Sequence, residues 1–444
     1  MHMKYNYNEV IEIIQNTRRF GNLTGYEVSK QMLEQLGNPQ SGIPFVHVAG
    51  TNGKGSTTAF LCKILEQTGK KVGMFTSPHL ITFEERIRIN GNYISKEDVT
   101  RLGNQLLTTE FNVSPTMFDY CLAMAVLYFK EQNCDIMVME TGIGGRYDST
   151  NALGLPEVAV ITKIGYDHMA VLGDTIEEIA NEKAGIIKEN GIVVTSQQEA
   201  AVKTVLYDSF TKVNAVQYYE IGPGDIGYVK TLPMRMTGSY QLENAATAVA
   251  VAKTLFKKWN EEQTFISSES EQEAYIREGV SKAFWKGRME IVNDNPFFMI
   301  DGAHNGHGVH ALAESLKALY PGEKFHFIMG VMADKDYEKM IEELLPIALD
   351  FVTVTPESNR ALQSKELAEC ITQKGIKARY AEDMEAVIRP FLPQHNCVMK
   401  DTTVIKTSDK EVHVYLTHAD HKTIAFGSLY FIGAIEAMLD KNKG

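Results

Sequence analysis

The run Val48-Ala49-Gly50-Thr51-Asn52-Gly53-Lys54-Gly55-Ser56-Thr57-Thr58 places a glycine-rich loop between two apolar stretches. Residues 45–49 before the loop predict a buried strand, and residues 56–67 after it predict a helix. Glycines let backbone N–H groups surround phosphate oxygens, and the start of a helix adds partial positive charge. Lys54 can reach the outer phosphates of a nucleotide, and the Ser56 hydroxyl can approach Mg²⁺. The loop therefore predicts nucleotide binding, although its spacing differs from the G-x-x-x-x-G-K-[ST] pattern.

Short apolar runs rich in β-forming residues alternate with helical patterns along the chain, which predicts parallel sheets wrapped by helices. The turn-forming run Asn293-Asp294-Asn295-Pro296 separates two such series. We expect an α/β fold of two domains. Residues 1–293 would form an ATP-binding domain with a mostly parallel, P-loop-type sheet flanked by helices, and residues 294–444 a smaller, Rossmann-like α/β domain.

Other elements follow from the same patterns. Small apolar residues between 238 and 256 predict a helix, and the polar, acidic residues 260–262 and 267–271 predict a solvated loop. The remaining strands are expected at residues 71–75, 136–139, 158–161 and 192–194 in the first domain and at residues 297–300, 325–329, 351–354 and 424–426 in the second.

The composition of the 444-residue chain is that of a folded protein, with 44% apolar and 23% charged residues. Its 44 Lys and Arg against 56 Asp and Glu give a net charge of −12, which disfavours nonspecific binding to nucleic acid. No stretch approaches the roughly 18 apolar residues of a membrane helix. Five cysteines without a C-x-x-C pair indicate reduced thiols. We expect a cytoplasmic monomer that binds neither nucleic acid nor a membrane.

Further motifs follow the loop in order. They are Thr76-Ser77-Pro78-His79-Leu80, Thr116-Met117-Phe118-Asp119-Tyr120, Glu140-Thr141-Gly142-Ile143-Gly144-Gly145-Arg146-Tyr147-Asp148-Ser149-Thr150-Asn151, Ile164-Gly165-Tyr166-Asp167-His168, Glu182-Lys183-Ala184-Gly185, Glu243-Asn244-Ala245-Ala246, Gly287-Arg288-Met289-Glu290, Asp301-Gly302-Ala303-His304-Asn305, Asp334-Lys335-Asp336 and Gly427-Ser428-Leu429-Tyr430. Together, over nearly the whole chain, they resemble the folylpolyglutamate synthase and dihydrofolate synthase family of the Mur ligase superfamily.

This resemblance implies an ATP-dependent amide ligase that adds L-glutamate to a pteroate or folate carboxylate through an acyl phosphate, giving ADP and phosphate. We expect both dihydropteroate and reduced folates as substrates. Polyglutamylation alone is one alternative. A UDP-sugar-peptide ligase is another, but it would normally carry an additional N-terminal domain, whereas the glycine loop here begins at Gly50. A P-loop ATPase without ligase chemistry would explain the loop alone.

The resemblance also implies metal ligands. It assigns Mg²⁺ to Ser77, Glu140 and His168, and it implies that Lys183 is carbamylated, which would turn a cation into an anionic oxygen ligand for a second Mg²⁺. The residues alone allow a different interpretation. A lysine after Glu182 on an amphipathic helix is normally a solvated charge, and a histidine in an Asp-His pair is usually structural.

The remaining site residues come from the same resemblance. Catalytic roles fall to Lys54, Lys183 and His304. The ATP-binding set is Asn52, Gly53, Lys54, Gly55, Ser56, Thr57, Asn244, Arg288 and Asp301. The pteroate-binding set is Phe118, Asp119, Tyr147, Asp148 and Ser149. Arg360 and Ser428 are candidates for glutamate because an acidic amino acid needs hydrogen-bond donors.

The chain departs from the family pattern at four places. Gly306 replaces a common proline, Tyr240 a histidine and Asp119 a glutamate, and Tyr147-Asp148-Ser149 replaces leucine-aspartate-alanine. The changes at Asp119 and Tyr147 bear on the substrate preference.

Overall fold

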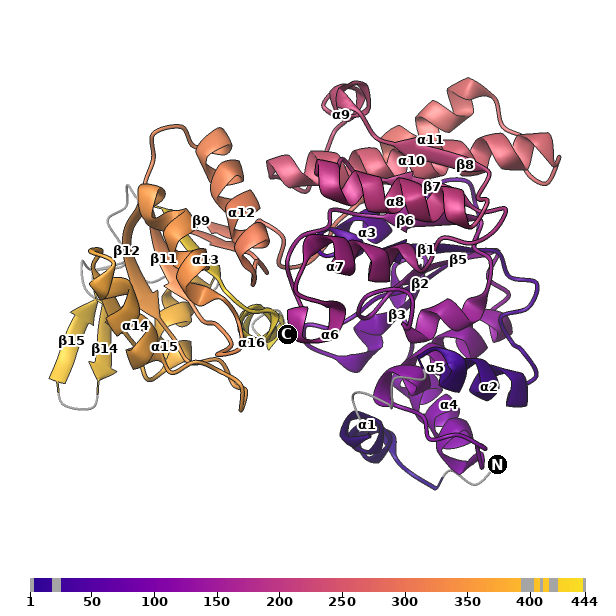
Figure 1. Cartoon of the computed structure of the whole chain (residues 1–444). Coiled ribbons are helices and arrows are strands. Elements are labelled where there is room, and N and C mark those ends of the chain that lie inside the picture. Colours follow the sequence, from indigo (N-terminus) through magenta and orange to yellow (C-terminus); the bar gives the residue numbers. More distant parts are fainter. Residues whose placement is uncertain (1–3, 18–24, 393–402, 408–409, 415–421, 442–444) are drawn as a thin grey trace. The chain divides into compact units, whose positions relative to one another are not determined.

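The computed structural model describes residues 4–17, 25–392, 403–407, 410–414 and 422–441. The chain divides into two compact units, coloured along the sequence in Figure 1. The first unit comprises Met1–Arg235 and Gln241–Phe284, and the second comprises Met236–Tyr240 and Trp285–Gly444. The main change of unit falls at Trp285 rather than residue 294, because the strand that ends at Asp294 pairs within the second sheet.

The first unit contains an eight-stranded sheet in the order β4-β3-β2-β5-β1-β6-β7-β8. All neighbouring pairs are parallel except β2 with β3 and β3 with β4. The carboxyl ends of the six parallel strands therefore lie at one edge, where open α/β sheets bind ligands. The strands are β1 (Phe45–Ala49), β2 (Val72–Phe75), β3 (Ile87–Ile89), β4 (Asn92–Tyr93), β5 (Ile136–Glu140), β6 (Val158–Ile161), β7 (Ile192–Thr195) and β8 (Gln217–Glu220).

Helices cover this sheet, with α7 and α8 over the face turned toward the viewer in Figure 1. Helix α3 (Lys54–Glu66) is buried along most of its length and packs against α11, where Gly279 permits the close approach. The other helices of this unit are α1 (Tyr7–Asn16), α2 (Glu27–Gln35), α4 (Lys96–Thr108), α5 (Met117–Glu131), α6 (Met169–Leu172), α7 (Ile176–Ala184), α8 (Ala200–Lys212), α9 (Pro223–Val229), α10 (Ser239–Glu261) and α11 (Glu269–Lys282), with 3-10 helices η1 (Phe83–Arg86) and η2 (Ser149–Leu153).

The second unit contains a six-stranded sheet in the order β13-β12-β11-β16-β10-β9, parallel except for the β9 edge. Two apolar clusters cover its opposite faces. Its elements are β9 (Glu290–Asp294), β10 (Phe297–Ile300), α12 (Gly306–Leu319), β11 (Phe325–Met329), α13 (Tyr337–Leu344), η3 (Leu345–Ile347), β12 (Ala348–Thr353), α14 (Ser364–Gln373), β13 (Ala378–Tyr380), α15 (Met384–Ile388), η4 (Arg389–Phe391), β16 (Lys422–Phe426) and α16 (Leu429–Lys441). A separate hairpin joins β14 (Thr403–Thr407) to β15 (Lys410–Val414).

The predicted fold class is confirmed, since a larger, mostly parallel sheet accompanies a smaller Rossmann-like one. The expected loop through the acidic residues is confirmed only for residues 262–268. Residues 260 and 261 end α10, and α11 already begins at Glu269. The cause is a capping box, in which Ser268 Oγ accepts from the Glu271 amide at 3.3 Å and Glu271 Oε2 accepts from the Ser268 amide at 2.8 Å.

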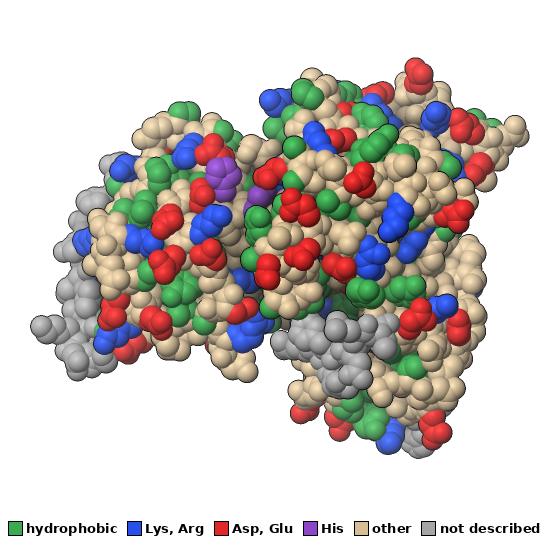
Figure 2. Space-filling view, in the orientation of Figure 1, with side chains coloured by type: hydrophobic (Ala, Val, Ile, Leu, Met, Phe, Trp, Pro, Cys, Tyr) green, Lys and Arg blue, Asp and Glu red, His purple; other side chains and the backbone are tan. Residues whose placement is uncertain are grey.

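Cys62, Cys121 and Cys134 are buried and Cys370 is partly buried, all as free thiols, and Cys397 lies outside the described residues. Acidic and basic side chains are interspersed over the face drawn in Figure 2. None of the described helices has both the length and the apolar character required to span a membrane.

Candidate active site

The glycine loop begins where β1 ends, at the carboxyl edge of the first sheet. The Thr51 and Asn52 amides donate to the Lys163 carbonyl oxygen at 3.0 and 3.1 Å, which ties the loop to the segment after β6. Gly50 has φ 152°, and a Cβ atom there would lie 1.9 Å from Thr162 Oγ1. Gly53 has φ 88° and caps α3. These two backbone positions therefore require glycine, and the loop opens directly onto a helix N-terminus.

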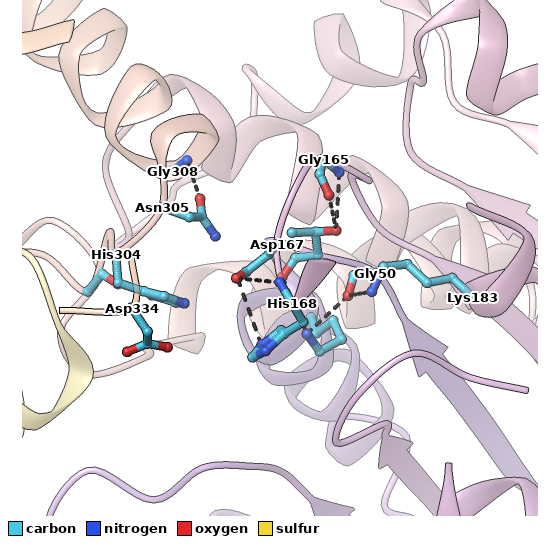
Figure 3. Close-up of polar contacts among 12 residues, drawn as sticks. Gly50, Gly165, Asp167, His168, Lys183, His304, Asn305, Gly308 and Asp334 are labelled. Atoms are coloured by element: carbon cyan, nitrogen blue, oxygen red, sulfur yellow. Dashed lines mark hydrogen bonds and ion pairs between the residues drawn. The ribbon is translucent and has the colours of Figure 1, made fainter. Parts of the chain in front are cut away.

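Two lysines meet at this loop. Lys54 Nζ donates to the carbonyl oxygens of Gly50 at 3.1 Å and Thr51 at 3.3 Å. Lys183, on α7, donates to the same Gly50 oxygen at 2.9 Å (Figure 3). The Lys183 side chain is only 4% exposed, so the interpretation of this residue as a solvated surface charge is wrong. Burial first, and then the nearby Lys54 charge, lowers the pKa of Lys183 to about 7.

Helix α10 packs against the glycine loop. A Cβ atom on Gly53 would lie 2.2 Å from Asn244 Oδ1, so the Asn244 amide packs directly on the loop backbone. Asn244 Nδ2 donates to Gln241 Oε1 at 2.9 Å, and Gln241 Nε2 donates to Ser56 Oγ at 3.3 Å. The buried Thr57 hydroxyl finds no hydrogen-bond partner within the described ranges. Gln241 was not among the predicted site residues, although it lies one helical turn before Asn244.

The structure brings Ser77 and Glu140 together. Ser77 follows β2, Glu140 ends the neighbouring strand β5, and the Ser77 amide donates to Glu140 Oε2 at 3.3 Å. Glu140 is 4% exposed. A buried carboxylate and a serine hydroxyl are oxygen donors of the kind that Mg²⁺ prefers. These two side chains therefore fit the predicted metal.

His168 lies on the loop after β6. It has φ 53°, its amide donates to Asp167 Oδ1 at 2.9 Å, and its ring Nε2 is 3.9 Å from Asp167 Oδ2 (Figure 3). The His168 side chain is 45% exposed, whereas Asp167 is largely buried. The Asp167 charge also acts on Lys183, since it opposes the lowering of the pKa of that lysine. Asp167 is thus a carboxylate near the loop lysines that the sequence did not single out.

The predicted pteroate residues form a connected cluster around η2. Asp119 accepts from the Thr116 amide and hydroxyl, each at 2.7 Å, from Ser149 Oγ at 2.7 Å and from Ser29 Oγ. Phe118 lies against Phe75, with ring centroids 5.6 Å apart. Both Asp119 oxygens already accept hydrogen bonds in this arrangement, so Asp119 joins α2, α5 and η2.

Asp148 belongs to the motif that begins at Glu140 and, like Asp119, accepts several hydrogen bonds. Its Oδ2 accepts from the Gly142 and Ile143 amides at 2.8 and 2.9 Å, and its Oδ1 accepts from the Thr150 amide at 3.0 Å. The buried His47 on β1 lies 2.7 Å from Thr150 Oγ1. Burial raises the pKa of Asp148, while these donors oppose the change. Tyr147, in contrast, is exposed.

The second unit gathers Arg288, Asp301 and His304 at the carboxyl end of β10. Asp301 Oδ2 accepts from Tyr240 Oη and the Met289 amide at 2.8 Å each, and its Oδ1 accepts from the Ala303 amide at 2.8 Å. A Cβ atom on Gly302 would lie 2.7 Å from an Arg288 nitrogen, so the guanidinium packs on this backbone. Burial raises the pKa of Asp301, and the Arg288 charge is the main opposing influence.

His304 has a defined tautomer. Its Nδ1 lies 2.8 Å from the Gly302 carbonyl oxygen, which can only accept, so Nδ1 carries the proton. Asn305 next to it caps α12 and accepts from the Gly308 amide at 2.7 Å (Figure 3).

The two candidate glutamate residues also follow strands of this sheet. Arg360, after β12, pairs with Asp334 at 2.5 Å and is exposed. Ser428, after β16, is buried, and its Oγ accepts from the Phe431 amide at 3.1 Å, which caps α16. Arg360 is therefore available to solvent, whereas Ser428 has a structural partner.

Comparison with known proteins identifies the two units. The Mur ligase middle domain matches residues 48–252, and the Mur ligase glutamate ligase domain matches residues 287–407. The chain is 37% identical to the dihydrofolate synthase/folylpolyglutamate synthase of Bacillus subtilis (strain 168) over 412 residues, which is 86% of this chain and 92% of that protein.

Two solved structures have the same architecture. Folylpolyglutamate synthase from Thermotoga maritima superposes with a TM-score of 0.75 at 30% identity, over 98% of this chain and 97% of that chain. Folylpolyglutamate synthase from Mycobacterium tuberculosis, solved with ADP, superposes with a TM-score of 0.81 at 25% identity, over 98% of each. The resemblance inferred from the motifs is confirmed. The chain therefore belongs to the folylpolyglutamate synthase/dihydrofolate synthase family of Mur ligases, which are ATP-dependent ligases.

Proposed function

We propose that the chain adds L-glutamate to the carboxylates of dihydropteroate and of reduced folates, and so combines dihydrofolate synthase with folylpolyglutamate synthase activity. The observation that carries this proposal is the pair Lys54 and Lys183 on the glycine loop, at the carboxyl edge of a sheet whose residues match the Mur ligase middle domain. The names of the related enzymes support the pterin substrate and the bifunctional assignment.

The proposed reaction has two steps. A substrate carboxylate oxygen attacks the γ-phosphorus of ATP, the bond from phosphorus to the bridging oxygen breaks, and ADP leaves. The neutral amino group of glutamate then attacks the acyl carbon of the acyl phosphate, the carbon–oxygen bond to phosphate breaks, and the amine loses a proton. The first step joins two anions, so catalysis depends on positive charge and N–H donors at the phosphates. Asn52, Gly53, Lys54, Gly55, Ser56 and Thr57 would supply them.

We assign Mg²⁺ to Ser77, Glu140 and His168, where it would neutralise phosphate charge when bound. The contact between the Ser77 amide and Glu140 supports this set, because it holds the carboxylate next to the serine. Asn244 would complete the nucleotide site in the first unit. Arg288 and Asp301 are proposed as further nucleotide-binding residues, since a guanidinium fork suits phosphate oxygens.

Lys183 is proposed to be carbamylated. The neutral Nζ would attack CO₂, form a nitrogen–carbon bond and lose a proton, which leaves an anionic carbamate as an oxygen ligand for a second Mg²⁺. A pKa of about 7 supports this step, because much of the side chain is then neutral at neutral pH. With ¹³C-bicarbonate, a carbamate signal should appear in the wild-type protein and be absent from Lys183→Met. A wild-type protein that stays fully active in bicarbonate and shows only free amine would contradict the modification.

The remaining roles concern the other substrates. Phe118, Asp119, Tyr147, Asp148 and Ser149 would form the pteroate region, with exposed Tyr147 as its direct contact. Arg360 and Ser428 would bind glutamate, and Arg360 suits a carboxylate because its exposed fork can make two parallel hydrogen bonds. His304 would accept a proton through Nε2, the nitrogen that its tautomer leaves without one. The first unit would then act as the ATP and pteroate domain and the second unit as the glutamate ligase domain.

An oxygen-transfer experiment tests the acyl phosphate. Dihydropteroate labelled with ¹⁸O in its carboxylate should pass one labelled oxygen to the released phosphate, because the attacking carboxylate oxygen leaves with that phosphate. The new amide would keep the other labelled oxygen. Phosphate without the label would rule out this route, even if a glutamate conjugate were formed.

A further inference from the structure

Arg288 lies on a left-handed turn. Gly287 before it has φ 66°, and Met289 after it has φ 47°. Residues other than glycine rarely adopt this left-handed backbone conformation. Such a turn persists only where its surroundings hold it. One support is Asp301, which accepts from the Met289 amide at 2.8 Å, and another is the Gly302 amide, which donates to the Gly287 carbonyl oxygen at 2.7 Å.

Glu290 provides the support on the other side. It is the first residue of β9, and its Oε2 accepts from the Gly287 amide at 2.8 Å. Two carboxylates, those of Asp301 and Glu290, therefore hold the amides that flank Arg288. The position of the Arg288 side chain depends on both of them.

The Glu290 carboxyl group also meets a second glutamate. Glu436 on α16 is 1% exposed, and its carboxyl group contacts that of Glu290. Glu436 Oε2 is 3.3 Å from Lys286 Nζ, which also lies 3.2 Å from Asp440 Oδ2. Glu436 Oε1 is buried and has no hydrogen-bond donor in the part of the chain that the structure describes.

These contacts require a proton. Two ionised carboxylates in contact repel each other, whereas one proton between them turns the contact into a hydrogen bond. An ammonium group can only donate, so Glu436 Oε2 accepts from Lys286, and the shared proton lies between the two carboxyl groups rather than toward Lys286. Burial, followed by the Glu290 charge, raises the pKa of Glu436, while Lys286 opposes the change. The charged groups at this contact are Glu290 from β9, Lys286 from the preceding turn and Asp440 on α16 itself.

We propose that Glu436 and Glu290 share one proton and act as positioning residues, which hold Arg288 in place through the Gly287 amide. Loss of the shared proton at alkaline pH would drive the two carboxylates apart and release the Gly287 amide. The turn would then loosen, and the nucleotide would bind more weakly. This last consequence rests on the proposed role of Arg288 in nucleotide binding.

The shared proton is tested without any assay of activity. Infrared spectra of the full chain at neutral pH should contain the C=O band of a protonated, buried carboxyl group, and alkaline pH should abolish it. Glu436→Gln should lack this band, because its amide donates to Glu290 permanently. Asp440→Asn is the matched control, since it changes a partner of Lys286 but keeps the glutamate pair, and it should retain the band. If the wild-type spectrum contains no carboxyl band that disappears in Glu436→Gln, the shared proton is ruled out.

The positioning role is tested through ATP. The KM for ATP of the wild-type protein and of Asp440→Asn should rise severalfold from neutral to alkaline pH, whereas Glu436→Gln should match the wild type at neutral pH and then stay flat. Glu290→Gln is the second variant. Its amide can still accept from Gly287 and donate to Glu436, so it should stay flat as well. An alkaline rise in both glutamine variants equal to that of the wild type would overturn the positioning role.

The shared proton and the nucleotide role of Arg288 can be tested separately. If Arg288→Ala leaves the KM for ATP unchanged while the infrared band behaves as expected, the proposed nucleotide role of Arg288 is overturned and the shared proton stands.

Discussion

Lys54 and Lys183 donate to one and the same atom, the Gly50 carbonyl oxygen, at 3.1 and 2.9 Å. One lysine comes from the loop itself and the other from a helix more than a hundred residues further along the chain. Two ammonium groups so close together repel each other, and the buried one is the more easily deprotonated. The arrangement is therefore suited to receive negative charge, whether from a phosphate or from a modification of Lys183.

The pH dependence of stability should reveal the buried Lys183. The pKa of Lys183 in the folded protein, about 7, lies below the ordinary lysine value of 10.5, so between these two pH values unfolding takes up a proton. Stability must then rise with pH across this window, and the extra stability must be lost as pH falls toward 7. Lys183→Met should remove that part of the slope, whereas the exposed-lysine control Lys257→Met should keep it. Urea denaturation in CO₂-free buffer measures the effect, and equal slopes for wild type and Lys183→Met would contradict the buried neutral amine.

Gly50→Ala should disrupt the loop, because the new Cβ atom would lie 1.9 Å from Thr162 Oγ1 at a φ of 152°. We expect a loss of stability of about 1–3 kcal/mol from the forced backbone conformation, with loss of ATP binding. Gly224→Ala is the control, since open space surrounds its Cβ position and its φ is not in the left-handed region. Calorimetric titration with an ATP analogue and thermal unfolding test both effects. Undiminished ATP binding by Gly50→Ala would show that the loop tolerates a side chain there.

We expect the main effect of Asp119→Asn to be a loss of folding stability rather than a change in substrate affinity. Asp119 accepts from Thr116, Ser149 and Ser29, and an amide can replace only part of these acceptor sites. Leaving buried donors unpaired costs about 1–3 kcal/mol. Urea denaturation, together with the KM for dihydropteroate, separates the two roles. A variant of wild-type stability with a raised KM would mean that Asp119 serves the substrate and not the fold.

Arg288→Ala should keep its fold and lose turnover. The guanidinium packs on Gly302, and its proposed role is to bind the phosphates, so removing it should cost on the order of 10²-fold in kcat/KM. Arg389→Ala is the matched control, because Arg389 is an exposed arginine of the same unit and pairs with Glu385 on the same helical segment. Circular dichroism and steady-state kinetics check the two expectations. A folded Arg288→Ala variant with wild-type kcat/KM would remove this residue from the proposed site.

The sequence predicted the parallel strands well because they are continuous apolar runs bounded by turns. It did not predict the edge strands β4 and β8, since Asn92–Tyr93 and Gln217–Glu220 are polar or exposed and are ordered by pairing with a neighbour. The start of α11 was missed although Ser268 and Glu271 form a capping box, because the acidic composition of this stretch resembled that of a loop.

The positions of the candidate site residues in the fold could be predicted only in part. Ser77 and Glu140 follow neighbouring parallel strands, so topology alone brings them to one edge. The burial of Lys183 could not be inferred, because it depends on the packing of α7 against a loop far away in the sequence. The positions of Asp167, Gln241 and the Glu290–Glu436 contact could not be inferred either, because each depends on residues from another element.

The most direct test of the proposed function is phosphate release by the purified chain with Mg-ATP and L-glutamate, compared among 7,8-dihydropteroate, tetrahydrofolate and no pterin. Mass spectrometry should identify the products. We predict release with either pterin, dependence on glutamate, and products heavier by one glutamyl residue. Release with tetrahydrofolate alone would limit the chain to polyglutamylation. Phosphate release that is independent of both pterin and glutamate would contradict the proposed ligase function.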